Sequence, residues 1–299
     1  MDNTKFYGSI VALVTPFVKA TGAIDEAAYK KLVEWQIKEG TNGIVPCGTT
    51  GESPTLSAQE HGRVIEICVE AAAKKVPVIA GTGSNSTSEA VEYSKHAAKV
   101  GADALLVVTP YYNKPTNKGI YLHYKAVSEA VNIPIILYNI AGRTGRNIEP
   151  ELMAKLAADF KNIIGVKEAS GSLEQMLRIK EICPKGFLLI SGDDGLTLPM
   201  LAIGGVGVIS VAANIVPRDV ASLITAFNNG DLKKAQAINL KLLPLIRALF
   251  IETNPVPVKT AVSLMGLCNP DLRLPMCEMD ESNLAKLKQA LVSYGLLKG

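Results

Sequence analysis

The sequence predicts an α/β protein, a (β/α)8 TIM barrel with a C-terminal helical extension. Eight short β-rich runs alternate with helical segments over about 220 residues, which is the count and length typical of such a barrel. Most of these runs are almost continuously apolar, as expected for parallel strands covered by helices. The first strand-to-helix turn lacks a Gly-x-Gly-x-x-Gly fingerprint, which disfavours the competing open doubly wound sheet.

The expected strands share short apolar or β-branched runs bounded by turn residues. They are Ser9–Thr15, Gly43–Cys47, Pro77–Gly81, Ala104–Thr109, Ile135–Asn139, Ile163–Lys167, Phe187–Ser191 and Gly207–Val211. The helical stretches between them are Asp25–Glu39, Ser57–Lys74, Thr87–Val100, Lys118–Val131 and Leu173–Ile182.

Local signals support several helix ends. The pairs Ser57/Glu60, Ser86/Glu89 and Ser172/Gln175 have the spacing of a capping box at a helix start. Gly40, Gly101 and Gly186 follow helices, where a left-handed residue is often needed.

The β-rich runs stop after about residue 215. The remaining helices are expected at Asp219–Phe227, Leu232–Phe250, Val258–Leu264 and Glu281–Tyr294. No Ser- or Gly-rich linker separates them from the barrel. We therefore expect residues 1–229 to form the catalytic barrel and residues 230–299 to form an extension packed on it.

Composition excludes several classes of function. A net charge of +3 over 299 residues indicates neither a nucleic-acid nor a membrane partner. The three His and five Cys residues show no paired metal-ligand spacing, so we expect no metal site, and no cofactor motif is present. The N-terminal run is neither a signal peptide nor a membrane span, and the scattered cysteines fit a reducing compartment. These features predict a cytoplasmic protein.

Lys167 is the most informative residue, because it ends the otherwise apolar run Ile163–Lys167. A lysine is rarely buried without a partner. If its amine is held among Ile and Val side chains it loses hydration, and a neutral, nucleophilic amine becomes accessible, as Schiff-base chemistry requires. The alternative is a strand-end lysine with a buried stem and a solvated head.

The active site of a (β/α)8 barrel lies at the C-terminal ends of its strands. The polar segments at these ends are Gly48–Glu52, Thr109–Asn113, Tyr138-Asn139 with Arg143–Gly145, Lys167-Glu168, Ser191–Asp194 and Ile209-Ser210. Together they offer one amine, several hydroxyls and one guanidinium, which suits imine chemistry on an α-keto acid. Tyr138, on the strand beside Lys167, is placed to relay protons, while Thr49-Thr50 and Arg143 could bind carboxylates.

Three of these segments resemble a known family. Gly48–Glu52, Tyr138–Gly145 and Ile163–Ala169 are similar to the signatures of the 4-hydroxy-tetrahydrodipicolinate synthases (dihydrodipicolinate synthases) of the N-acetylneuraminate lyase superfamily. The resemblance runs essentially end to end and includes the late segment Asn254–Lys259. It implies a pyruvate-dependent class I aldolase without a cofactor. This enzyme condenses pyruvate with aspartate 4-semialdehyde, a committed step of lysine and diaminopimelate biosynthesis.

The resemblance also implies residue roles. Lys167 would form the imine, and Tyr138, linked through Thr49 to Tyr112 from a neighbouring subunit, would shuttle protons. Thr50 would hold the pyruvate carboxylate and Arg143 that of the semialdehyde. Gly192 and the carbonyl of Ile209 would line the pocket.

The family further implies a homotetramer, a dimer of dimers, and in many members inhibition by lysine. The matching positions for a lysine site are Ser53, Pro54, Ala58, His61, Asn85, Glu89 and Tyr111. Ala58 departs from the histidine of some lysine-sensitive members. Ala141 stands where many members have proline, whose fixed φ would stiffen the loop that presents Arg143.

Two other functions remain open from the sequence. A sialic acid or 2-keto-3-deoxy sugar acid lyase of the same superfamily would share Lys167 and Tyr138, but would want polyol-binding groups in place of Arg143. A non-catalytic metabolite-sensing barrel is the alternative of another class, which the intact lysine, tyrosine and threonine positions disfavour.

Overall fold

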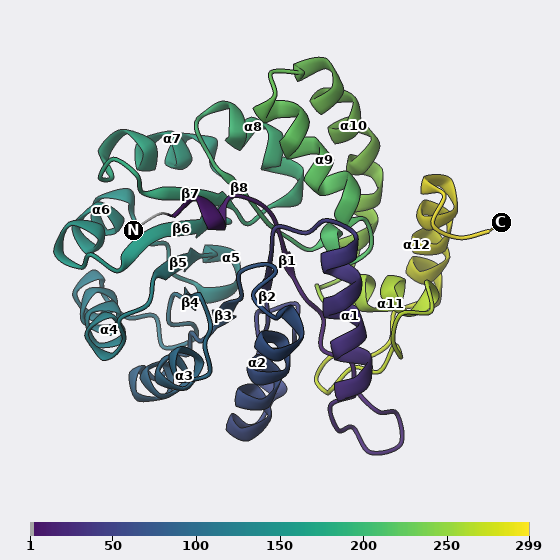
Figure 1. The fold of residues 1–299 in the computed structure, drawn as a ribbon, viewed down its shortest axis with the longest axis horizontal. Coiled ribbons are helices and arrows are strands. Elements are labelled where there is room, and N and C mark those ends of the chain that lie inside the picture. The colour runs from purple at the N-terminus through teal and green to yellow at the C-terminus, as the bar shows by residue number, and fades with distance from the viewer. Residues whose placement is uncertain (1–2, 299) are drawn as a thin grey trace.

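A computed structural model describes residues 3–298, in which eight parallel strands follow one another in the order β2-β1-β8-β7-β6-β5-β4-β3. An isolated parallel bridge between Ile44 and Val78 joins the two ends of this sheet and closes the barrel (Figure 1). The strands are β1 (Gly8–Ala12), β2 (Gly43–Val45), β3 (Ile79–Gly81), β4 (Ala104–Val108), β5 (Ile135–Asn139), β6 (Ile163–Glu168), β7 (Leu188–Ser191) and β8 (Gly207–Ser210). The predicted (β/α)8 fold is confirmed.

Helices surround the strands in the order that the alternating pattern predicts. They are α1 (Glu26–Lys38), α2 (Ala58–Ala72), α3 (Thr87–Lys99), α4 (Asn117–Ala130), α5 (Ala141–Thr144), α6 (Pro150–Asp159), α7 (Leu173–Ile182), α8 (Thr197–Ala202) and α9 (Pro217–Asn228). Short 3₁₀ turns lie at η1 (Thr4–Phe6), η2 (Ser53–Thr55), η3 (Asp194–Leu196) and η4 (Ala212–Asn214). The sequence does not predict α5, α6 or α8, of which α5 and α8 are only four and six residues long.

All three helix-start signals lie at observed helix starts, and in two of them the serine side chain caps the helix. Ser57 and Glu60 form a complete capping box, and the hydroxyl of Ser172 accepts from the amide of Gln175. The expected cap at Ser86 is wrong, although α3 does begin there. The Glu89 carboxylate is instead bound by the hydroxyl of Ser84, which also accepts from the Ser86 amide. Gly40, Gly101 and Gly186 all have a positive φ, as expected.

Apolar side chains form two separate cores, because successive residues of a strand point to opposite faces. One core fills the barrel interior and includes Ile10, Val45, Ile136 and Ile190. The larger core lies between the strands and the surrounding helices. Tyr138 belongs to the inner core, so the interior is packed below the C-terminal ends of the strands.

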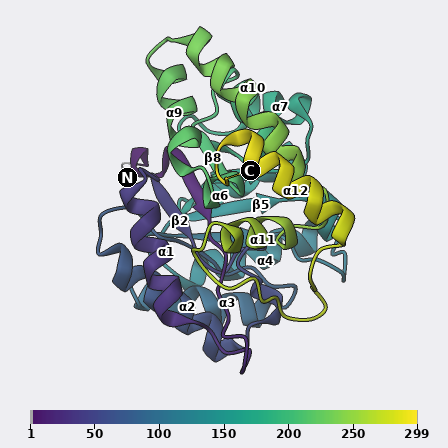
Figure 2. The same cartoon turned by 90° about the vertical axis from the view of Figure 1, so that its right-hand side faces the viewer.

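The chain continues beyond the barrel as α10 (Leu232–Leu249), α11 (Val256–Leu264) and α12 (Glu281–Tyr294). In Figure 2 these three helices lie together on one side of the molecule. α10 packs on α9 and α12 packs on α10, while Lys259 of α11 forms a buried ion pair with Glu52 in the loop after β2. The extension therefore reaches the loops at the C-terminal ends of the strands. Among residues 3–298, no helix is both long and apolar enough to cross a membrane.

Candidate active site

Lys167 lies on β6 with only 6 % of its surface exposed. Tyr138 stands opposite it in the β5–β6 ladder, and the Lys167 Nζ is 4.2 Å from the centroid of the Tyr138 ring. Within residues 3–298, no hydrogen-bond or ion-pair partner is present for this Nζ. The alternative of a solvated lysine head does not fit this burial. A buried amine against a phenol is the arrangement that imine chemistry needs.

Gly192, just after β7, makes room for the lysine. A Cβ at this position would lie 3.1 Å from the Cε of Lys167 and 2.6 Å from the Cβ of Ala169. The second distance is shorter than real Cβ contacts allow, so any larger residue would displace the lysine stem or the strand end. This close approach explains why the sequence has a glycine here.

The turn after β2 presents the two threonines. Cys47 and Glu52, on either side of the turn, have positive φ values of 52° and 56°, which brings the chain back sharply. Thr50 is almost fully buried, with 2 % exposed. Its hydroxyl oxygen accepts a hydrogen bond of 3.0 Å from the Nδ2 of Asn254. The hydroxyl proton of Thr50 is thus left free to donate to a ligand carboxylate.

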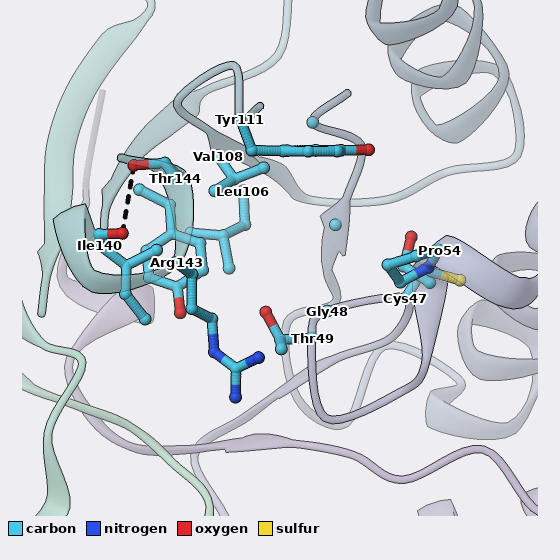
Figure 3. Close-up of a pocket in the computed structure, with 14 residues that line it drawn as sticks. Cys47, Gly48, Thr49, Pro54, Leu106, Val108, Tyr111, Ile140, Arg143 and Thr144 are labelled. Atoms are coloured by element: carbon cyan, nitrogen blue, oxygen red, sulfur yellow. Dashed lines mark hydrogen bonds between the residues drawn. The ribbon is translucent and has the colours of Figure 1, made fainter. Parts of the chain in front are cut away.

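A hollow at the C-terminal ends of the strands joins these groups. Polar and apolar residues from separate parts of the chain line it, among them Thr49, Thr50, Tyr138, Ile140, Arg143, Lys167, Gly192, Val211, Phe250 and Asn254. A second, outer hollow shares Gly48, Thr49, Leu106, Tyr138, Ile140 and Arg143 with it, so the two are continuous. The outer hollow extends toward Ser53, Pro54 and Tyr111. Figure 3 shows Tyr111 and Arg143 on its wall.

Arg143 projects from the short helix α5 toward Thr49 (Figure 3). Its Nη2 donates to the backbone carbonyl of Asn254 at 2.9 Å. No carboxylate within residues 3–298 forms an ion pair with it. A guanidinium with one neutral partner keeps donors for an anionic ligand.

Asn254 is the site residue that sequence reasoning missed. It lies between α10 and α11, is 5 % exposed, and contacts both Thr50 and Arg143, while its own Oδ1 is buried with no partner in the described part of the chain, residues 3–298. The contact with Thr50 spans 204 positions in the chain. In the sequence, the only signal for Asn254 is that it lies in the segment Asn254–Lys259. No local pattern indicates so distant a contact.

Asp194 is a second buried polar group that the sequence does not assign. Burial raises the pKa of its carboxyl group, and hydrogen bonds from the Ser210 hydroxyl and from the amides of Val211 and Ala212 oppose this. Because Val211 lines the hollow, these bonds hold the chain after β8 against the site.

Two predicted site residues lie apart from this hollow in the single chain. Tyr112 is 89 % exposed and has a φ of 69°, a strained value for a non-glycine residue. Ile209 is buried in the inner core on β8, and neither residue is among those that line the hollow. The role predicted for Tyr112 depends on a partner subunit, and the role predicted for Ile209 depends on its backbone carbonyl.

Three of the seven residues predicted for a lysine site lie on the outer hollow. Ser53, Pro54 and Tyr111 line it. His61 is 2 % exposed and stacks on Tyr93 with a centroid distance of 4.1 Å, and both of its ring nitrogens are buried with no hydrogen-bond partner among residues 3–298. Burial lowers the pKa of His61 to about 4, so this imidazole is neutral near pH 7.

The other three positions differ in their placement. The carboxylate of Glu89 is bound by Ser84, and the carbonyl of Asn85 accepts from Asn113 at 2.9 Å. Ala58 instead lines a different hollow beside Arg63 and His96. Asn85, Glu89 and Ala58 are therefore not among the residues that line the outer hollow.

The fold and the site together define a class, the (β/α)8 barrel enzymes that act through a Schiff-base lysine. Comparison with known proteins gives the family. The profile of the dihydrodipicolinate synthetase family matches residues 5–293, and the chain belongs to this family.

Relatives and solved structures agree over almost the whole length. The 4-hydroxy-tetrahydrodipicolinate synthase of Endomicrobium trichonymphae is 60 % identical over 293 residues, covering 98 % of this chain and 100 % of that protein. A crystal structure of dihydrodipicolinate synthase from Aquifex aeolicus superposes with a TM-score of 0.96 at 49 % identity, covering 98 % of this chain and 100 % of that one. A structure of DHDPS from Cyanidioschyzon merolae with lysine bound has a TM-score of 0.94 at 42 % identity, covering 98 % and 99 % of the two chains.

Proposed function

We propose that this enzyme condenses pyruvate with L-aspartate 4-semialdehyde to form 4-hydroxy-tetrahydrodipicolinate, on the path to diaminopimelate and lysine. The observation that carries the proposal is the buried Nζ of Lys167, which lies against the ring of Tyr138 and has no hydrogen-bond or ion-pair partner among the described residues 3–298. The names of the relatives point to the same reaction. Residues 1–229 supply the barrel of this catalytic unit, and residues 230–299 the extension.

The reaction begins on pyruvate. The Nζ of Lys167 adds to the C2 carbonyl, water leaves, and an iminium forms. Its positive nitrogen acidifies the C3 methyl group, and loss of one proton gives an enamine. Tyr138 lies against the amine and is placed to accept and return the protons that these steps move. The Thr50 hydroxyl holds the keto-acid carboxylate.

The enamine then reacts with the second substrate. Its C3 attacks the aldehyde carbon of the semialdehyde, forming the new carbon–carbon bond. The substrate's own amine next adds to the iminium carbon and displaces Lys167, which closes the ring and frees the enzyme. One water is released overall, at imine formation. Arg143 at the mouth of the hollow binds the carboxylate of the semialdehyde.

Arg143 also distinguishes this function from sugar-acid cleavage, because a guanidinium fits a second carboxylate better than a polyol. We expect Arg143→Ala to raise the KM for aspartate semialdehyde by about tenfold to a hundredfold, since a hydrogen-bonded charge is lost. Trapping of the pyruvate imine by borohydride should stay near the native level. Equal loss of imine trapping would contradict the role assigned to Arg143, and cleavage of sugar acids in preference to condensation would overturn the function.

The proposed enzyme works as a homotetramer, a dimer of dimers, in which Tyr112 enters the site of a neighbouring subunit. The exposure and strained φ of Tyr112 support this, because a tyrosine held in such a conformation gains from packing against a partner. Sedimentation combined with activity assays tests it. If Tyr112→Phe has native activity, or if a monomer is fully active, the role of Tyr112 in trans is wrong.

Lysine is the proposed inhibitor, bound near Ser53, Pro54, His61, Asn85, Glu89 and Tyr111. The Glu89 carboxylate suits an ammonium group, and the lysine bound in the Cyanidioschyzon merolae structure supports the proposal. Initial rates that do not change at millimolar lysine would contradict it. Glu89→Gln should weaken inhibition without changing the uninhibited rate.

A further inference from the structure

The ladder between the two catalytic strands contains an irregularity. Ile135 of β5 pairs with Ile163 of β6, but the next residue, Ile136, pairs with Gly165, so Ile164 is an extra residue in β6. Beyond this bulge, Tyr138 is opposite Lys167 and Asn139 is opposite Glu168. A slip of one residue would turn every following side chain to the other face of the sheet. Lys167 would then point away from the site.

Glu168 lies at the end of this ladder and is fully buried. Its two carboxylate oxygens accept hydrogen bonds from Asn139 Nδ2 at 3.0 and 3.2 Å. They also accept from the amide of Ser170 at 2.7 Å and from Nε2 of Gln175, in the first turn of α7, at 3.0 Å. Within residues 3–298, no Lys, Arg or His forms an ion pair with this carboxylate.

Asn139 completes the connection across the strands. Its Nδ2 also donates to Asn147, and its Oδ1 accepts from the amide of Ile148 at 2.9 Å. Asn147 and Gln175 are hydrogen-bonded to each other. The side chains of Asn139 and Glu168 thus tie β5, β6 and α7 together, immediately beyond Tyr138 and Lys167.

A buried carboxylate without a cationic partner is costly, so such a group usually serves a purpose that an apolar residue could not serve. We propose that Glu168 is a positioning residue, which fixes the register of β6 against β5 through Asn139 and so holds the Lys167 amine against the Tyr138 phenol. Glu168 acts from the opposite face of the strand, through the backbone, and does not touch the substrate. The inference rests on the proposed imine function.

Kinetics of single variants test this role. Glu168→Gln keeps the shape but places an amide N–H against the N–H donors of Asn139 or Gln175, while Glu168→Ala removes the group. Because a misplacement of about 1 Å can cost about a hundredfold in rate, we expect kcat to fall between about tenfold and a hundredfold. The rate of pyruvate imine trapping should fall in parallel. The KM for pyruvate should stay near its native value, because Thr50 is untouched.

Asn162→Ala is a matched control beside the same strand, β6. Asn162 just precedes β6, and its Nδ2 donates to the carbonyls of Ser128 and Val131 at 3.0 and 3.1 Å. The substitution removes a similar set of hydrogen bonds at the other end of the strand. It should lower the melting temperature and leave kcat and the trapping rate unchanged.

A residue swap tests the pairing itself. Asn139→Asp alone places two carboxylates opposite each other, which should lower kcat strongly. Combining it with Glu168→Gln restores one amide and one carboxylate across the strands. The double variant should regain about tenfold in kcat over Asn139→Asp, as expected for directly coupled residues.

The outcomes separate the inference from the function on which it rests. If the native enzyme traps no pyruvate, the proposed function is overturned, and the inference with it. If the native enzyme traps pyruvate and Glu168→Gln traps it at the same rate, only the inference is overturned. A loss of melting temperature with native kcat, like that of Asn162→Ala, would also assign Glu168 a purely structural role.

Discussion

Lys167 and Lys259 are both buried lysines, yet their surroundings differ in one decisive respect. Each amine lies over an aromatic ring, with Nζ 4.2 Å from the centroid of Tyr138 for Lys167 and 4.0 Å from that of Phe17 for Lys259. Lys259 is 0 % exposed and lies 2.6 Å from Glu52 Oε1. Among residues 3–298, Lys167 has no such acid.

We propose that this difference separates a structural lysine from the reactive one. Burial lowers the pKa of Lys259, and the Glu52 carboxylate opposes that shift, so the ammonium stays engaged in a pair. The pair joins the loop after β2 to α11, and the amide of Arg273 adds a hydrogen bond of 3.1 Å to the same carboxylate. The amine of Lys167 has no competing acid and faces an open hollow, where a carbonyl carbon can reach it.

The largest effect should come from removing the reactive lysine. Lys167→Ala should lower turnover by about 10⁴-fold or more, because no other group can form the imine. Its melting temperature should stay close to the native value or rise, since a buried amine without a partner is removed. Steady-state kinetics and a thermal melt measure both. Substantial residual turnover in Lys167→Ala would break the comparison.

The structural lysine should show the opposite result. Lys259→Met leaves Glu52 buried without its partner and should lower the free energy of unfolding by about 3–5 kcal/mol. The double variant Glu52→Gln/Lys259→Met should recover much of that loss, since the uncompensated charge is gone. Urea denaturation of the native enzyme, the two single variants and the double variant gives the coupling energy between Glu52 and Lys259. A destabilisation of Lys259→Met that the second substitution does not relieve would contradict the ion-pair account.

His61 extends the comparison to a third buried base without an acid partner. Its pKa in the folded state is about 4, below its ordinary value of 6.5, so the unfolded chain binds a proton that the folded chain refuses. The contribution of neutral His61 to the free energy of unfolding is therefore present above about pH 6.5 and is lost as the pH falls toward 4. The loss between pH 7 and pH 5 should be about 2 kcal/mol.

The measurement is urea denaturation at these two pH values for the native enzyme and for His61→Asn. His123, whose pKa burial also lowers to about 4, stays in both proteins and serves as an internal control. The loss of free energy of unfolding between pH 7 and pH 5 should be smaller in His61→Asn than in the native enzyme by about 2 kcal/mol. An identical pH dependence in the two proteins would show that His61 is protonated in the folded state.

The smallest effect concerns the loop that presents Arg143. Ala141 is the first residue of α5. Proline is well accepted at the first position of a helix. Ala141→Pro should therefore raise the free energy of unfolding by about 0.4–1 kcal/mol, with kcat unchanged. A lower melting temperature would show that the loop needs the freedom that alanine gives it.

The sequence predicts the barrel well because its strands are continuous apolar runs with clear boundaries. Ile135–Asn139, Leu173–Ile182 and Glu281–Tyr294 match the structure at both ends. β1 spans Gly8–Ala12, so it begins one residue before the predicted Ser9–Thr15 and ends three residues earlier. The short helices α5 and α8 carry too little periodicity to be recognised.

The site is predictable where its residues follow strands, and not where distant segments meet. Lys167 and Tyr138 lie on neighbouring strands, so topology alone places them together. Asn254 and Lys259 come from the extension, and their contacts with Thr50 and Glu52 span more than 200 positions. A lysine in a helix usually indicates a solvated face, so nothing local reveals the burial of Lys259.

Reductive trapping is the most direct test of the claim that the unpaired lysine is the nucleophile. The native enzyme is incubated with pyruvate and borohydride, and its peptides are mapped by mass spectrometry. We expect a single stable adduct on Lys167 and an unmodified Lys259, because only the former has a free amine beside an open hollow. An adduct on Lys259, or no adduct at all, would contradict the account.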